Sequence, residues 1–168
     1  LELTHDQRLM LLDSFGRLIE IDPWNGERSY VGPNFGLAVA LEVGDESLIV
    51  AENKEGKIFQ FSEINSEASI LSRVVLGDGS TLGSPVDVIS VDSGWFLVNQ
   101  SSGQLLKVEA DTGDRSVLAE DLGRPVSLAE DPVTRRVYIL DAKFAGAGIF
   151  LFDPLSGDVA QVSSFFKG

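Results

Sequence analysis

The pattern of apolar and polar positions along the chain consists of short apolar runs separated by turn residues. The clearest example opens at Gly148, where Ile149 to Phe152 is followed by the turn sequence Asp-Pro-Leu-Ser-Gly-Asp. Related segments open at Gly16, Gly56 and Gly103, so the four openings are 40, 47 and 45 residues apart. The runs are rich in β-branched and aromatic residues and are broken every few positions, which predicts strands rather than helices.

Each repeat contains four short apolar segments, which predicts a unit of four antiparallel strands. Four-stranded units of 40 to 47 residues are typical of propeller blades. We expect a single all-β domain over residues 1–168, a β-propeller of four four-stranded antiparallel blades at about 1–31, 32–76, 82–120 and 122–164. Four blades can form a complete small ring or part of a larger propeller. The one helix candidate, Ser62 to Leu71, contains turn residues that argue against a helix.

The turn after the third strand repeats one hairpin sequence. Asp22 and Asp153 can accept hydrogen bonds from backbone N–H groups two residues on, and the proline that follows each of them sets φ for the turn. A glycine such as Gly26 or Gly157 then adopts the left-handed conformation that closes a short hairpin. The acids of these turns resemble paired carboxylates, but the repetition predicts a structural role for them.

A second set of polar residues closes the second strand of each unit: Asp13, Glu52, Asn99 and Asp141. Our interpretation is that each side chain caps the following turn by accepting hydrogen bonds from its backbone N–H groups. The alternative is a ring of metal-binding or catalytic carboxylates. Such a ring needs to lie close to the propeller axis, which a second strand does not usually approach.

A third set lies at the start of the first strand of later units. Asn34, Ser84 and Arg124 precede this strand, and Asp87 and Ser127 lie just inside it. In a propeller these positions approach one end of the central channel. They are polar and differ from unit to unit while the framework repeats, which is expected where function is built. We predict that these five residues form a binding rim, and we assign no catalytic or metal-binding residue.

Taken together, the phrases Pro-Val-x-(Leu/Ile), Gly-x-(Ile/Leu) and Asp-Pro-x-(Ser/Asn)-Gly resemble NHL-type and gluconolactonase-like β-propeller repeats. They look most like the tandem propeller repeats of bacterial exported proteins, over nearly the whole chain. The resemblance implies an exported protein, whether periplasmic, cell-surface or extracellular. We expect a non-catalytic module for protein interaction or extracellular assembly. The alternative that the resemblance implies is a metal-dependent hydrolase or lyase of the gluconolactonase-like kind.

The enzyme signatures of such relatives are incomplete in this chain. Gluconolactonase-like enzymes carry an early Glu-Gly-Pro beside a divalent metal, whereas Gly32-Pro33-Asn34 lacks the acid. Related lyases need several histidines, and the single histidine here, His5, falls in a predicted turn. Trp24 and Trp95 occupy unrelated positions and are expected to be packing residues. No cysteine is present to act as a ligand or nucleophile. These observations favour a protein that is not an enzyme.

The net charge is −13, from 26 acidic and 13 basic residues, which disfavours nucleic acid and anionic membranes as partners. No apolar run approaches the roughly 20 residues that span a bilayer. The expected partner is another protein or a second copy of the chain, because an array that does not close leaves a sheet face open. No cofactor is expected. Calcium is a weak candidate at Asp78, whose loop lacks the Asp-x-Asp-x-Asp spacing of calcium loops.

Overall fold

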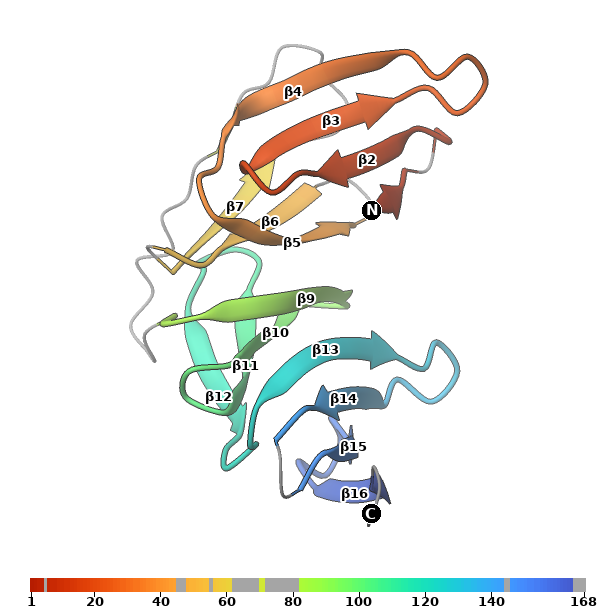
Figure 1. Cartoon of the computed structure of the whole chain (residues 1–168). Helices are drawn as coiled ribbons and strands as arrows, with labels where there is room; N and C mark the ends of the chain where they lie inside the picture. Colours follow the sequence, from red (N-terminus) through yellow and green to blue (C-terminus); the bar gives the residue numbers. More distant parts are fainter. Residues whose placement is uncertain are drawn as a thin grey trace.

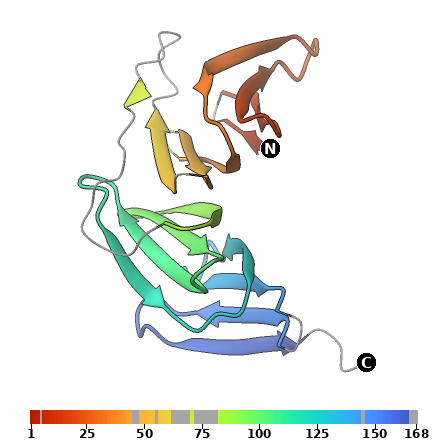
Figure 2. The ribbon, with the colours of Figure 1, turned by 60° about the vertical axis from the view of Figure 1, so that its left-hand side comes forward.

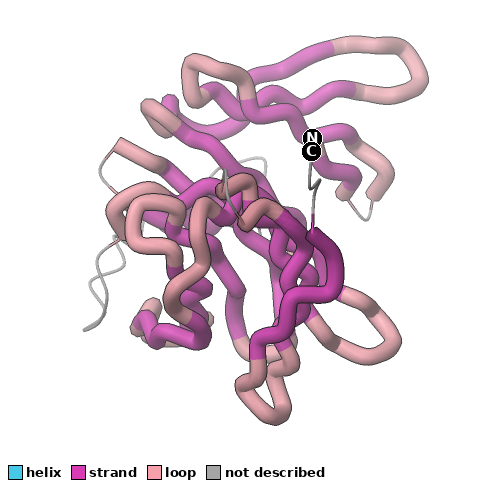
Figure 3. The backbone as a smooth tube through the Cα atoms, turned by 60° about the horizontal axis from the view of Figure 1, so that its bottom comes forward, coloured by secondary structure: helices cyan, strands magenta, loops and turns pink. Residues whose placement is uncertain are grey.

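The computed structural model describes residues 1–4, 6–44, 48–54, 56–61, 70–71, 82–143 and 146–164. In this part of the chain the regular structure is sixteen strands and no helix (Figure 1; Figure 3). The strands form four separate four-stranded sheets, each an antiparallel meander in chain order. The predicted all-β fold of four four-stranded antiparallel blades is confirmed. Residues 62–69 of the helix candidate and His5 lie outside the described residues.

The blades have the following strands. Blade 1 contains β1 (Glu2–Leu3), β2 (Leu9–Leu12), β3 (Arg17–Ile21) and β4 (Arg28–Asn34). Blade 2 contains β5 (Ala38–Val43), β6 (Leu48–Glu52), β7 (Lys57–Phe61) and β8 (Ile70–Leu71). Blade 3 contains β9 (Pro85–Val91), β10 (Gly94–Asn99), β11 (Gln104–Glu109) and β12 (Arg115–Ala119). Blade 4 contains β13 (Pro125–Glu130), β14 (Val137–Asp141), β15 (Gly148–Phe152) and β16 (Val159–Ser164).

The four blades follow one another along an open arc (Figure 1; Figure 2). The first strands β1, β5, β9 and β13 contact one another in sequence, so they line the inner side of the arc. Three buried clusters hold the described residues together, and each lies between consecutive blades. Blades 1 and 4 are the two ends of the arc. Among the described residues, the three buried clusters join blades 1 to 2, 2 to 3 and 3 to 4, and none of them joins blade 4 to blade 1.

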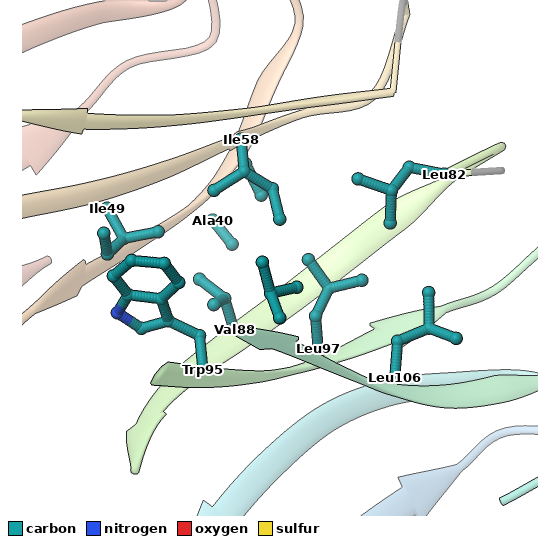
Figure 4. Packing of buried hydrophobic residues seen from close by; sticks show 10 residues of the cluster. Ala40, Ile49, Ile58, Leu82, Val88, Trp95, Leu97 and Leu106 are labelled. Carbon is teal, nitrogen blue, oxygen red and sulfur yellow. The ribbon is translucent and has the colours of Figure 1, made fainter. Parts of the chain in front are cut away.

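The second strands contribute more buried apolar residues to the core than the first, third or fourth strands do. β6 and β10 are buried along their whole length because they have a blade on each side. Figure 4 shows the cluster between blades 2 and 3, where Ile49 and Ile58 face Trp95 and Leu97. Burying side chains of this size stabilises the fold by about 2 kcal/mol each. The predicted packing role of Trp95 is confirmed, since it is 7% exposed.

The packing role predicted for Trp24 is wrong. It lies in the β3–β4 turn and is 83% exposed, because this turn extends beyond the neighbouring blade. The four residues of β2 are all apolar, which is typical of a strand covered on both faces, but the structure differs. Only Met10 of this strand is fully buried, because blade 1 has a neighbour on one side only.

A β-bulge near the start of the first strand explains the repeated Pro-Val phrase. In blade 3, Pro85 pairs with Asn99 and Asp87 with Val98, so Val86 is the extra residue. Blade 4 has the same shift at Val126. Bulges bend a strand and increase its twist. The phrase therefore marks the bend where the chain enters blades 3 and 4, and blade 2 has the same shift at Val39 without a proline.

The repeated glycine before the third strand has a reason that lies in the next blade. Gly103 has φ +63°, and its carbonyl oxygen accepts a hydrogen bond from the Leu122 N–H at 3.0 Å. A Cβ at this position would overlap the backbone carbonyl oxygen of Leu122. Gly16 and Gly56 meet the backbone that leads into the next blade in the same way. Glycine is therefore required where the link between two blades crosses the preceding turn.

Candidate functional site

The polar residue that closes each second strand serves as a backbone cap. Asp141 is 1% exposed, and its carboxylate accepts hydrogen bonds from three backbone N–H groups. The donors are Gly123 at 2.6 Å, Arg124 at 2.9 Å and Lys143 at 2.8 Å. Two of these donors belong to the link from blade 3, and the third belongs to the turn after β14. One buried carboxylate therefore joins the entry of the blade to its central turn.

The equivalent residues of the other blades bind in the same manner. The Asp13 carboxylate accepts from the Phe15 N–H at 2.9 Å, Glu52 from the Lys54 N–H at 2.7 Å, and Asn99 from the Ser84 N–H at 2.9 Å. The predicted cap of the following turn is confirmed for Asp13, Glu52 and Asp141, whereas the Ser84 N–H that binds Asn99 lies in the link that enters blade 3. Among the described residues, no three His, Cys, Asp or Glu side chains form a group that could hold a metal ion. The loop of Asp78 lies outside those residues.

Ser84 and Arg124 lie at equivalent positions in the links that enter blades 3 and 4. The Ser84 carbonyl accepts from the Gln100 N–H at 2.8 Å, and the Arg124 carbonyl accepts from the Ala142 N–H at 2.9 Å. In blade 2 the residue with this contact is Leu37, whose carbonyl accepts from the Asn53 N–H at 2.9 Å. Leu37, and not Asn34, is therefore the third member of this set.

Asn34 was aligned with the set because the sequence does not reveal where β4 ends. This strand continues to Asn34. Val31 pairs with Leu18, the register then shifts, and Asn34 pairs with Arg17. The Asn34 side chain accepts from the Gly36 N–H at 2.8 Å. It also lines a small cavity of about 190 Å³ with Arg17 and Tyr30. Asn34 thus belongs to the outer part of blade 1.

The structure does bring Asp87 and Ser127 together on neighbouring inner strands. The Ser127 hydroxyl donates to Asp87 Oδ2 at 2.9 Å, and the Leu128 N–H donates to the same oxygen at 2.8 Å. Asp87 Oδ1 accepts from the Val88 N–H at 3.0 Å. These bonds tie β9 to β13. The two residues are thus engaged with each other, and a role in binding a partner stays a prediction.

Two further carboxylates lie on the inner strands, at a position that the sequence did not reveal. Glu2 pairs with Met10 of β2, and Glu42 pairs with Ile49 of β6. Met10 and Ile49 each lie three residues before the capping residue that closes their strand. Burial raises the pKa of Glu42, and the neighbouring Glu2 and Asp87 charges add to this shift. Burial also raises the pKa of Glu2. The inner wall of blades 1 to 3 is therefore acidic.

A larger cavity, of about 360 Å³, opens between blades 3 and 4. Its floor contains Phe96 and Phe152, whose ring centroids lie 6.0 Å apart at an interplanar angle of 75°. Leu118 and Val91 complete the apolar lining. The cavity lies at the end of the blades that carries the β9–β10 and β13–β14 turns. The predicted rim lies at the opposite end, beside the links between blades.

Charged residues form the edge of this cavity. Arg135 has φ +60° in the β13–β14 turn, at the position that Gly26, Gly113 and Gly157 hold in the hairpins after the third strands. Its guanidinium donates to Asp92 and to Glu130. The contact with Asp92 joins the turn of blade 4 to that of blade 3, and the contact with Glu130 lies within blade 4. Lys107 lies on the same edge and is paired with Glu109 at 2.8 Å.

Exposed apolar residues continue from the cavity onto the turns of blade 4. Val133 is 86% exposed and Leu155 is 96% exposed. Arg136 binds Asp153 at 3.0 Å and so joins the two turns that carry them. Sequence reasoning missed this surface because the two phenylalanines of the floor are far apart in the chain. Only the contact between blades brings them together.

These features define a β-propeller, and comparison with solved structures identifies the same fold. A chain of a nidogen/laminin complex aligns with a TM-score of 0.74 and 16% identity, over 94% of this chain and 61% of that one. A gluconolactonase from Xanthomonas campestris gives 0.73 and 18%, over 92% and 58%. The extracellular domain of a hybrid two component system from B. thetaiotaomicron gives 0.71 and 12%, over 96% and 21%. At the level of sequence, no family model and no curated protein matches.

The chain spans less than two thirds of the length of each of these structures. Its likeness to them confirms the predicted resemblance to NHL-type and gluconolactonase-like propellers at the level of the fold. The neighbours include a protein complex and an enzyme, so the same fold serves both kinds of function. No helix long and apolar enough to cross a membrane occurs among the residues that the structure describes.

Proposed function

We propose that this chain is a non-catalytic propeller module that binds a protein partner through the cavity between blades 3 and 4. The observation that carries the proposal is a cavity of about 360 Å³ with an apolar floor. The turns of blade 4 that supply Arg135 and Pro154 to its lining also carry the exposed Val133 and Leu155. Pockets from about 300 Å³ upward are of the size that binds small ligands and anchoring side chains. Apolar anchors in such pockets dominate the energy of protein interfaces.

The charged edge supports a protein partner in particular. An interface commonly has an apolar centre and a polar, solvent-accessible border. Here Asp92, Glu130, Arg135 and Lys107 surround the apolar floor of Phe96 and Phe152. A partner that inserts a large apolar side chain would find polar groups on all sides of it. The nidogen/laminin complex shows that a propeller of similar fold occurs in a protein assembly, and the extracellular neighbour supports a function outside the cytoplasm.

The test begins with selection of short peptides from a displayed random library on the wild-type chain. Enriched peptides are expected to carry at least one large apolar side chain. Ser93 is an exposed residue of the cavity lining, and Ser93→Trp fills the opening without removing a core residue. We expect this variant to weaken binding about tenfold or more, which is 1.4 kcal/mol or more.

The matched control is Ser102→Trp, the same substitution at an exposed turn position at the other end of the blades. It is expected to leave peptide binding unchanged. Equal binding by wild type and Ser93→Trp would show that the cavity is not the site. Alanine variants of Asn34, Asp87 and Arg124 test the rim predicted from the sequence. If they weaken binding while Ser93→Trp does not, the partner binds at the opposite end.

The second candidate is a metal-assisted hydrolase or lyase of the gluconolactonase-like kind. It is favoured by the carboxylates of Glu2, Glu42 and Asp87, which the inner strands of three consecutive blades bring near the axis, and by the likeness to a gluconolactonase. These residues do not form a group that could hold a metal ion, so no step is derived from them. Elemental analysis and thermal shifts with calcium and zinc test the candidate. A bound divalent metal would favour it over the binding module.

A further inference from the structure

Each end blade of the arc leaves one apolar sheet face uncovered. In blade 4, Val137 and Ile139 are fully buried against blade 3, whereas Tyr138 and Leu140 are 40% and 37% exposed. Side chains of a strand alternate between its two faces, so Tyr138 and Leu140 point away from blade 3. β16 is exposed along its whole length. Figure 1 shows blades 1 and 4 at opposite ends of the array.

The uncovered face of blade 4 is the repeat equivalent of a face that is packed elsewhere. In blade 4, Tyr138 and Leu140 precede the cap Asp141. Phe96 and Val98 precede the cap Asn99 of blade 3 by the same numbers of residues, so the two pairs hold equivalent positions. Phe96 and Val98 are buried in the cluster between blades 3 and 4. In blade 2, Ile49 and Ala51 hold this position and pack on blade 3. The face of blade 4 is therefore built to receive the next blade.

The uncovered face of blade 1 is the other half of this interface. Leu9 and Leu11 precede the cap Asp13 of blade 1. Val137 and Ile139 precede the cap Asp141 of blade 4 by the same numbers of residues, so the two pairs hold equivalent positions. Val137 and Ile139 pack on the preceding blade. Leu9 and Leu11 are only partly buried, and Ile19, which pairs with Leu11, shares their face. The two ends of the arc thus carry complementary halves of one repeated interface.

Neither end has the polar face that closes a repeat array against water. Terminal repeats of soluble arrays normally carry a polar outer surface. The third strand of each blade also has a position that faces the next blade. It is polar in blades 1 to 3, where it is Glu20, Gln60 and Lys107, and apolar in blade 4, where it is Leu151. The exposed end is thus more apolar than the same positions in the blades before it. An exposed apolar face of this kind marks an interface.

We propose that a second copy of this chain covers these faces, with blade 4 of each copy packed on blade 1 of the other. A head-to-tail contact of this kind is heterologous and closes into a ring when the rotation between units permits it. Two copies supply eight blades, which is within the range of about four to eight blades that known propellers contain. The cavity between blades 3 and 4 is not part of either face, so this assembly is independent of the proposed function.

Sedimentation equilibrium of the 168-residue chain tests the assembly directly. The wild type is expected to have twice the mass of one chain at micromolar concentration. Leu140→Lys on blade 4 and Leu11→Lys on blade 1 are each expected to self-associate at least about tenfold more weakly than the wild type, because a buried unpaired charge is costly. Leu155→Lys, at an exposed turn residue outside both faces, is the control and should leave the mass unchanged.

Mixing the two variants provides the sharpest result. Leu140→Lys retains an intact blade 1 face and Leu11→Lys an intact blade 4 face, so the mixture is expected to form pairs that neither variant forms alone. Such pairs also show that both variants are folded. A monomeric wild type overturns the proposal. So does loss of association in Leu140→Lys alone, because that pattern indicates pairing of like faces. Growth of the wild type into long chains overturns the closed ring.

Discussion

Replacing Asp141 by alanine tests whether the repeated caps hold the blades together. The carboxylate is buried and accepts from the N–H groups of Gly123, Arg124 and Lys143. Alanine leaves these three donors without that acceptor. A buried donor left unpaired costs at least about 1 kcal/mol, and water can replace part of this set because Arg124 and Lys143 are exposed residues, so we expect a loss of about 2 kcal/mol. For a chain of this size, that corresponds to a fall in Tm of about 4 to 8 °C.

Asp141→Asn is expected to cost less than Asp141→Ala. An asparagine at this position retains one acceptor oxygen, which can keep the bonds to Arg124 and Lys143 that Asp141 Oδ1 makes. Asn99 is the natural residue at this position in blade 3, where its Oδ1 accepts from the Ser84 N–H and the Ser101 hydroxyl. The expected order of stability is therefore Asp, then Asn, then Ala.

Urea denaturation followed by circular dichroism provides the free energy of unfolding for each variant. The control is Glu120→Ala, which removes an exposed carboxylate of the same charge and is expected to change stability by no more than about 0.5 kcal/mol. If Asp141→Ala matches the control, the backbone hydrogen bonds of the cap do not stabilise the blade. If Asn and Ala behave alike, the number of donors left unpaired does not determine the cost.

Two further predictions concern the links between blades and the inner wall. Gly103→Ala should destabilise the chain by at least about 2 kcal/mol more than Gly26→Ala, measured by urea denaturation. Both glycines have positive φ, but only at Gly103 would a Cβ overlap a neighbouring backbone oxygen, and equal losses would contradict this. Glu42→Gln should raise the Tm at pH 7 and not below about pH 4. Because burial raises the pKa of Glu42, its folded form favours the protonated carboxyl, so the stabilisation by this group is present below its ordinary pKa of 4.5 and is lost as pH rises through the folded pKa. The amide keeps an acceptor for the Ser90 N–H, and a gain of equal size at both pH values would refute this account.

The repeated hairpin after the third strand shows how much of the fold is readable from local chemistry. Asp22 and Asp153 accept from the backbone N–H groups two residues on, Trp24 and Leu155, at 2.7 and 3.0 Å. Gly26 has the predicted left-handed φ of 74°. Each of these contacts lies within one turn, so a single copy of the sequence specifies it. Their recurrence was sufficient to predict four blades of four strands.

The candidate site was less predictable because it depends on register and on contacts between blades. The pairing of Ser127 with Asp87 joins two strands whose residues are 40 positions apart, and it was anticipated only as a shared rim. Asn34 was assigned to the same rim, but a register shift in the β3–β4 pairing places it at the end of β4. The shift adds two residues to β4 between Val31 and Asn34, and the apolar pattern of the chain carries no signal of it.

The sequence by itself determined the all-β class, the blade period, the hairpin turns and the capping of the turns that follow β2, β6 and β14, because these follow from interactions among residues close in the chain. The tertiary structure alone decided why Gly103 must be glycine, which carboxylates share the inner wall, and that Phe96 and Phe152 form the floor of one cavity. It also decided that Tyr138 and Leu140 remain uncovered while their equivalents in blades 2 and 3 are buried. Identical local patterns meet different neighbours at the ends of an array, and burial depends on the neighbour.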